Sequence, residues 1–247
     1  MRNFIRGIVP GVALVFVPIV AGAVTGSAPT KPLRHLTYTF TYSQSNDRTQ
    51  HDSGIGGPSS GMADSHSGKT DKGTITADVM QATTDLGLIV SISEQSQEGR
   101  TAESANCAVY GNTNVVCDAN KKVNDEEYAL LRLLGREFVN TALLDERNHW
   151  SIASSSPLYE RTSDFTVLEN KGDVLKITET RVEKQKGAQA YTASVDGKIT
   201  YDLNKTVPVA IDENTMLRQN VGMGSYETDQ TQIFLALQSD SLGGTSS

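Results

Sequence analysis

Large apolar side chains alternate with polar ones along several short segments of the chain, a pattern typical of β-strands with one buried face. The clearest case spans residues 36–42, where Leu36, Tyr38, Phe40 and Tyr42 alternate with threonines. Further strands are predicted at 73–80, 86–93, 165–169, 174–183, 190–195, 198–203, 207–211, 215–219 and 230–238. Turns are predicted at residues 170–173 and at Asp196-Gly197. One apolar and one polar face per strand favour an antiparallel sheet with one side in water.

Two segments lack this alternation. Residues 43–72 consist mainly of Ser, Gly, Asp, Asn and His, and we expect a disordered insertion there. Residues 240–247 are predicted to form a flexible tail. Between them, residues 24–239 are expected to form a single β-rich domain that carries the insertion.

A helix is predicted from Asn124 to Phe138. Asn124 is the expected N-cap and Glu127 stands at the capping-box position, with acidic residues in the first turn. Tyr128, Leu131 and Leu134 recur at helical spacing, and this apolar stripe must cover an apolar surface. We therefore expect an α+β, mainly β fold, in which one amphipathic helix covers a single curved antiparallel sheet shaped like a half-barrel meander.

The first 23 residues resemble an export signal. Arg2 and Arg6 precede an apolar run, and Ala21-Gly22-Ala23 fits a processing site. We expect cleavage after Ala23, with an uncleaved anchor as the alternative, and a secreted or periplasmic location. On this hypothesis the protein meets the membrane only transiently, through the signal segment.

The two cysteines, Cys107 and Cys117, flank a segment that is symmetric about Gly111-Asn112-Thr113. A three-residue hairpin loop there places Val109 opposite Val115 and the two cysteines opposite each other. In an oxidising compartment this predicts a disulfide.

Composition excludes some classes of function. The formal net charge is −7, so a long basic surface for nucleic acid is not expected. We expect no metal site and no cofactor: His51 and His66 lie in the predicted insertion, and His35 and His149 lack a cluster of partners.

No catalytic residues are predicted. The chain has no Gly-x-Ser-x-Gly elbow and no His-Glu-x-x-His pair, and Gly222-Met223-Gly224-Ser225 lies between predicted strands without a following helix. The carboxylate pairs Asp125-Glu126 and Asp212-Glu213 are better explained by a helix cap and a strand end. Asn204-Lys205-Thr206 fits a glycosylation acceptor of a eukaryotic secretory route.

The order of elements resembles the periplasmic lipoprotein-carrier superfamily, the relatives of lipoprotein localisation factors. The resemblance involves the export signal, the helix from Asn124 to Phe138 between β-rich stretches, and the late meander around residues 196–202. It implies a strongly curved antiparallel half-barrel with helices on the concave side. It carries over no binding residues to this chain.

Three functions are compatible with the sequence. The first is a non-enzymatic exported domain that binds an apolar ligand or lipid between sheet and helix. The second is a structural or interaction module that recognises a cell-envelope protein through a strand edge or a polar sheet face. The third and least favoured is a hydrolase of envelope polymers without a recognisable motif.

Overall fold

A computed structural model describes residues 31–49, 65–83, 87–99, 104–135, 139, 148–155, 159–187, 190–222 and 225–243. They form one antiparallel sheet of eleven strands, in the order β5-β4-β3-β2-β1-β11-β10-β9-β8-β7-β6. The strands are β1 (Arg34–Thr49), β2 (Ser65–Thr83), β3 (Gly87–Ser96), β4 (Ala105–Val109), β5 (Val115–Cys117), β6 (His149–Ser155), β7 (Tyr159–Lys171), β8 (Val174–Gln185), β9 (Tyr191–Asp202), β10 (Val207–Gly222) and β11 (Ser225–Asp240).

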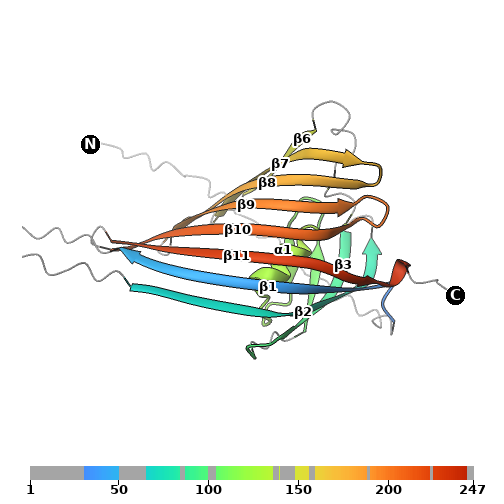
Figure 1. The fold of residues 1–247 in the computed structure, drawn as a ribbon, viewed down its shortest axis with the longest axis horizontal. Helices are drawn as coiled ribbons and strands as arrows, with labels where there is room; N and C mark the ends of the chain where they lie inside the picture. Colours follow the sequence, from blue (N-terminus) through green and yellow to red (C-terminus); the bar gives the residue numbers. More distant parts are fainter. Residues whose placement is uncertain are drawn as a thin grey trace, which may run out of the picture.

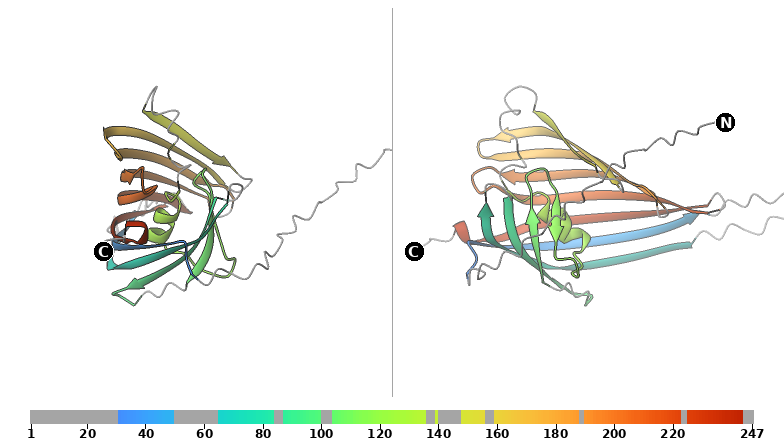
Figure 2. Two further views of the ribbon diagram at one scale, coloured as in Figure 1. Left: turned by 90° about the vertical axis from the view of Figure 1, so that its right-hand side faces the viewer. Right: turned by 180° about the vertical axis from the view of Figure 1, so that it is seen from behind.

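The sheet is an open, curved meander with the first strand at its centre. β1 pairs with β2 on one side and with β11 on the other, so the two halves of the chain extend outward from it (Figure 1). The sheet bends around the helix α1 (Asp125–Leu131), which lies on its concave side (Figure 2). This confirms the predicted fold class, a mainly β protein with a single curved antiparallel sheet and one helix against it.

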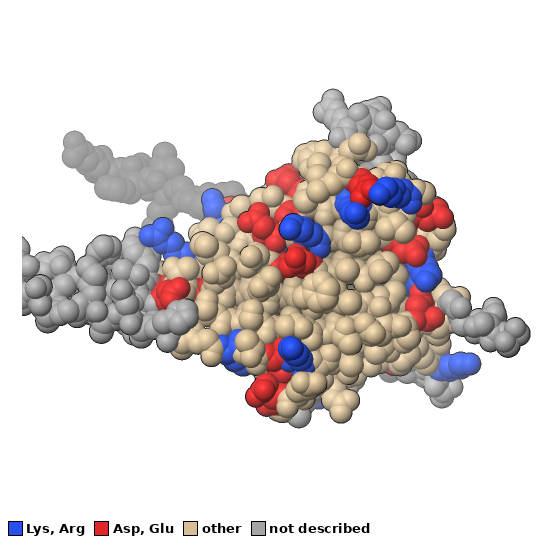
Figure 3. Space-filling model, in the orientation of Figure 1, with Lys and Arg blue, Asp and Glu red and all other residues tan. Residues whose placement is uncertain are grey.

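The apolar core lies between the concave face and α1. Leu36, Tyr38 and Phe40 are buried on β1, and α1 packs against β3, β10 and β11. A glycine at position 73 is required here, because a Cβ atom would lie 2.6 Å from Cε1 of Phe40 and 2.1 Å from the carbonyl oxygen of Gln95. The convex face is hydrated: small groups of opposite charge, such as Glu169 with Lys176, lie between stretches of uncharged surface (Figure 3).

The helix begins as predicted but is shorter. Glu127 accepts a hydrogen bond of 2.9 Å from the backbone N–H of Asn124, as in a capping box. The α-helix ends at Leu131 rather than at Phe138, because Leu133 and Leu134 donate their N–H groups three residues back and Gly135 follows with φ of 100°. This tightened turn still buries both leucines, so it extends the apolar stripe without further helix. Residues 136–138 lie outside the described residues.

The prediction of a disordered insertion at 43–72 is wrong at both ends of that range, where the residues form strands. β1 continues to Thr49 and β2 begins at Ser65, so that Ser43 pairs with Gln232 on one side and Thr70 on the other. Strand pairing needs only backbone donors and acceptors, and here polar side chains occupy both faces because the apolar core does not reach this end of the sheet. Residues 50–64 and the predicted signal segment 1–23 lie outside the described residues.

Two further boundaries differ from the predictions. β9 runs through Asp196-Gly197 without a turn, and β10 joins the two segments predicted at 207–211 and 215–219. At the C-terminus β11 includes Asp240, which pairs with Arg34 at 2.7 Å, and a 3₁₀ turn, η2 (Ser241–Gly243), follows. The tail therefore begins after 243 at the earliest. The sequence pattern also missed β6, whose Trp150 stacks on Phe165 with ring centroids 5.1 Å apart.

The cysteine hairpin was predicted correctly. Cys107 pairs with Cys117 and Val109 with Val115, and Tyr110 N–H donates to the carbonyl of Asn114 at 2.9 Å. The two cysteines form a disulfide. A disulfide indicates folding in an oxidising environment.

Candidate ligand-binding groove

The concave face changes character along the strands. On β8 the inward side chains are, in order, Leu175, Ile177, Glu179, Arg181 and Glu183. The apolar end belongs to the core, whereas the charged end continues past the first turn of α1. The helix therefore covers only part of the concave face.

Two hollows flank Tyr128 at the beginning of α1. The inner hollow, of about 260 Å³, lies between α1 and the sheet; its lining is Gln44, Asp125, Tyr128, Arg181, Glu183, Tyr191, Ala193, Val195, Glu213, Thr215, Leu217, Asp229, Thr231 and Ile233. The hairpin hollow, of about 580 Å³, lies beside the β4–β5 hairpin; its lining is Tyr110, Asn112, Asn114, Val115, Val116, Tyr128, Tyr159, Arg161 and Glu183. Because both linings include Tyr128 and Glu183, the hollows adjoin there, and together we call them the groove.

A buried ion network holds α1 beside the groove. Arg132 follows the helix and donates to both oxygens of Glu179, at 2.9 and 2.6 Å, and to Glu213. Arg181 donates to the other oxygen of Glu213 at 2.9 Å. The two positive and two negative charges balance. The network ties the end of α1 to β8 and β10 and thereby fixes the inner wall of the groove.

The charges of this network are maintained by mutual contact. Burial by itself raises the pKa of Glu213, but the Arg132 and Arg181 guanidiniums outweigh it and lower that pKa to about 2. Burial likewise lowers the pKa of Arg132, while the two carboxylates raise it further than burial lowers it. Both groups are therefore ionised at neutral pH.

Gly197 lies within β9, where a turn was predicted, because it is paired with β8 on one side and with β10 on the other. It pairs with Glu179 across the β8–β9 ladder. A Cβ atom at position 197 would lie 3.4 Å from Cβ and 3.5 Å from Oε2 of Glu179. Both distances are those of ordinary van der Waals contact, so a small side chain such as alanine fits at this position beside the carboxylate that binds Arg132.

The boundary between the two hollows combines tyrosines with charged groups. Tyr191 donates a long hydrogen bond of 3.4 Å to Glu183, and burial together with the Glu183 charge raises the pKa of Tyr191. On the hairpin side, Arg161 donates to the hydroxyl of Tyr128, to the carbonyl of Thr113 at 3.3 Å and to Oδ1 of Asn114 at 2.6 Å. Arg161 thus joins β7 to both α1 and the hairpin.

The lining supplies surfaces for binding. Ala193, Val195 and Ile233 provide an apolar wall, and the tyrosines add rings with a polar edge. Among the described residues, neither hollow is lined by a histidine, cysteine or serine. Thr215 donates a long hydrogen bond of 3.4 Å to Glu213 in the described lining, but that carboxylate is already ion-paired to Arg132 and Arg181.

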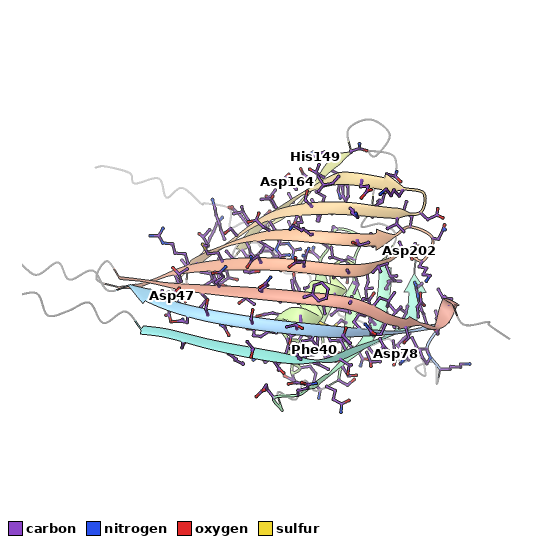
Figure 4. The ribbon with its side chains drawn as sticks, in the orientation of Figure 1. Phe40, Asp47, Asp78, His149, Asp164 and Asp202 are labelled. Atoms are coloured by element: carbon purple, nitrogen blue, oxygen red, sulfur yellow. A yellow bond between two sulfur atoms is a disulfide. The ribbon has the colours of Figure 1, made fainter. Side chains whose placement is uncertain are left out.

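Most of the candidate residues named from the sequence lie apart from the groove, and the exceptions are Asp125 and Glu213, described below. His35 contacts Asp78 at 2.6 Å in an exposed pair. His149 lies 4.0 Å from Asp164, and both of these side chains are about half exposed (Figure 4). His66 is on β2, and His51 lies outside the described residues. Within the described part of the chain, no group of three or more His, Cys, Asp or Glu residues is arranged to hold a metal ion.

In each of the carboxylate pairs Asp125-Glu126 and Asp212-Glu213, the two side chains lie in different surroundings. Asp125 lines the inner hollow, whereas Glu126 is fully buried. Glu213 belongs to the ion network, whereas Asp212 faces the other side of β10. Asn204 is exposed in the turn between β9 and β10, and the Gly222–Ser225 segment connects β10 to β11.

Sequence inspection missed the arginines that shape the groove. Arg161 and Arg181 occupy inward positions on strands that also bury apolar side chains, Phe165 and Val167 on β7 and Leu175 and Ile177 on β8. A charged residue at an apolar position of an alternating strand was therefore the available signal, since such a charge needs a buried partner.

Comparisons with known proteins give little beyond the fold. The sequence matches no protein-family model and none of the curated protein sequences. In structure it is similar to lipovitellin, solved in a study of lipid–protein interactions, with a TM-score of 0.48 and 8% identity over 86% of this chain and 26% of that chain. The chain thus spans about a quarter of lipovitellin, and at this similarity nothing about the ligands of lipovitellin transfers to it. No helix among the described residues has the length and hydropathy needed to cross a bilayer.

Proposed function

We propose that this chain is an exported, non-enzymatic binding protein that holds an apolar or amphipathic ligand, such as an acyl chain, in the groove. The observation that carries the proposal is the open part of the concave face beside Tyr128. There Ala193 and Val195 of β9 line a hollow together with Ile233, which also belongs to the apolar core. The disulfide supports an oxidising compartment, and the predicted export signal agrees with it.

The size of the groove limits the ligand. Small-molecule sites in proteins usually enclose about 300–1,000 Å³. The inner hollow alone, at about 260 Å³, falls just below this range, whereas the hairpin hollow, at about 580 Å³, lies within it. A ligand that extends through both hollows is therefore a single-chain amphiphile rather than a lipid with several chains.

The environment of the lining groups supports binding over catalysis. Glu213 is ion-paired to two arginines and its pKa is lowered, so it is a poor proton acceptor at neutral pH. Asp229 accepts a hydrogen bond from Asn46 at 2.5 Å, and Glu183 accepts one from Tyr191.

The test is to fill the inner hollow. Ala193→Trp places a large ring in the hollow, whereas Ser194→Trp places the same ring on the opposite, exposed face of β9. Titration with a dansyl-labelled undecanoic acid should show binding to the wild type and to Ser194→Trp, and at least tenfold weaker binding to Ala193→Trp. Leu217→Trp with Met216→Trp as control repeats the test on β10 if Ala193→Trp does not fold.

Native mass spectrometry of gently purified protein provides an independent measurement. It should show a co-purified amphiphile that is absent from Ala193→Trp. A wild-type protein that is always empty and does not bind the dansyl probe contradicts the proposal.

Recognition of an envelope protein is a second candidate, and one observation favours it. The sheet ends at β6, whose outer edge has no partner strand among the described residues. An extended peptide can add to such an edge. A photocrosslinking residue at the exposed Ala153 should then capture one defined envelope protein, and the same residue at Ser194 should not.

A further inference from the structure

Arg161 differs from the other buried arginines of the described residues in having no carboxylate partner. Arg34 pairs with Asp240, Arg132 with Glu179 and Glu213, and Arg181 with Glu213. Arg161 is only 5% exposed, yet no carboxylate among the described residues lies within 4.0 Å of it. Its partners are the neutral oxygens of Tyr128, Thr113 and Asn114.

Such a charge is costly. A guanidinium remains protonated in proteins, and burying it without a salt-bridge partner carries a large desolvation penalty. The three neutral acceptors take three of its five N–H donors, and the hydrogen bonds among the described residues give no acceptor for the other two. Because Arg161 also lines the hairpin hollow, its charge faces a space open to a ligand.

We propose that Arg161 binds the anionic headgroup of the ligand, and that this headgroup is the carboxylate of a single-chain fatty acid. The inference rests on the proposed function and names the polar end of the same ligand. Guanidinium–carboxylate contacts are strong because both partners are charged. Asn112 and Asn114 place further amide groups in the lining of the hollow.

The remaining lining suits the methylene chain. Val115, Val116 and the rings of Tyr110 and Tyr159 form apolar surface in the same hollow as Arg161. From there the chain passes Tyr128 and reaches the wall of Val195 and Ile233 in the inner hollow. Glu183 is the one carboxylate in the described lining of the hairpin hollow, and it lies in the part of the wall shared with the inner hollow. Glu183 lies opposite Arg161 in the β7–β8 ladder but outside salt-bridge distance, and it accepts a hydrogen bond from Tyr191, so the N–H groups of Arg161 are placed to bind the anionic end of the ligand.

The experiment compares two probes that differ only in the headgroup, palmitate and 1-hexadecanol, by displacement of a neutral fluorescent alkyl probe at pH 7.5. Wild-type protein should bind palmitate at least tenfold more tightly than hexadecanol. Arg161→Gln should bind both with the affinity of hexadecanol, and Arg161→Lys should retain part of the preference. Arg34→Gln is the matched control: Arg34 is similarly buried but lines neither hollow, and Asp240 neutralises it, so this variant should keep the preference for palmitate.

The outcomes separate this inference from the proposed function. Equal binding of palmitate and hexadecanol by the wild type overturns the role of Arg161 and leaves the proposed function standing, and this result needs no variant to fold. Binding of neither overturns the proposed function and this inference together. If only inorganic phosphate or acetate raises the melting temperature of the wild type, and not that of Arg161→Gln, Arg161 holds a small anion and the fatty acid is refuted.

Discussion

Glu213→Gln tests whether the buried ion network holds the helix against the sheet. Glu213 accepts hydrogen bonds from both Arg132 and Arg181, and its side chain is only 4% exposed. Glutamine has nearly the same shape but no charge, and its amide NH₂ cannot accept from an arginine. The variant leaves Glu179 as the single carboxylate for two buried guanidiniums.

The loss of stability in Glu213→Gln can be estimated from the surroundings of the Glu213 carboxyl. The pKa of Glu213 is lowered from 4.5 to about 2. At about 1.4 kcal/mol per tenfold change in proton affinity, this amounts to about 3 kcal/mol of stability. Removing one partner of a buried ion pair usually costs about 3–5 kcal/mol, in agreement with that value. For a chain of this size, we expect the melting temperature to fall by roughly 6–15 °C.

The pH dependence has a defined sign. Because the pKa of Glu213 is lower in the folded than in the unfolded state, its contribution is complete above pH 4.5 and is lost as the pH falls toward 2. The difference between wild type and Glu213→Gln should therefore be largest at neutral pH and disappear near pH 2. Thermal unfolding followed by circular dichroism at several pH values measures it.

Asp212→Asn is the control, because the neighbouring Asp212 lies on the opposite face of β10 and outside the network. It should change the free energy of unfolding by less than about 1 kcal/mol, as expected for a surface substitution. If Glu213→Gln melts within 2 °C of the wild type at pH 7, or if the difference persists unchanged at pH 2, the network does not hold the helix as described.

Two further predictions concern the hairpin and the beginning of the helix. Replacing Cys107 and Cys117 by serine should lower the free energy of unfolding by up to about 3 kcal/mol, as expected for a loop this short. The reduced wild type should melt at the same temperature as this double-serine variant. Free thiols in the oxidised wild type would contradict the disulfide. Burial and the nearby Glu126 raise the pKa of Glu94 to about 8, so the folded protein binds more protons than the unfolded chain and stability should decline between pH 4.5 and 8. Glu94→Gln should remove this decline in melting temperature, and an equal slope in both proteins would refute the assignment.

The parts of the fold that were predictable from sequence are local. The cysteine hairpin places its partners ten residues apart, so turn geometry alone determines its register. The alternation of β1 predicts which of its side chains are buried because one face of that strand belongs to the apolar core and the other meets water. In both cases the information lies within a short stretch of chain.

The same logic explains the errors. Ser43 and Thr70 lie in strands although neither contributes to an apolar face, because their backbone groups pair with neighbouring strands that sequence alone does not position. The helix was extended to Phe138 because Leu134 continues the spacing of Leu131, yet the tight turn before Gly135 buries Leu134 equally well. Apolar spacing therefore indicated burial correctly and helix length incorrectly.

The groove could not be predicted from the sequence because the residues that line it are far apart along the chain. Arg161 contacts Tyr128 across 33 residues, and Arg132 contacts Glu213 across 81. Each residue alone is an ordinary charged side chain in a strand or at a helix end. Only the order of strands shows that they line one concave face.

The two arginine sites have opposite charge balances, and this difference bears on the function. Arg132 and Arg181 are neutralised within the protein, and a balanced buried network of this kind is often no more stabilising than apolar residues of similar volume. Its main effect is then geometric, because it fixes the end of α1 relative to β8 and β10. Arg161 lies on the other side of the same helix and lacks a carboxylate, although it bonds to Tyr128 of α1. The protein thus holds the helix with charges that it balances itself, whereas Arg161, which lines the larger hollow, has no salt-bridge partner among the described residues and is the group to which we assign the anionic end of the ligand.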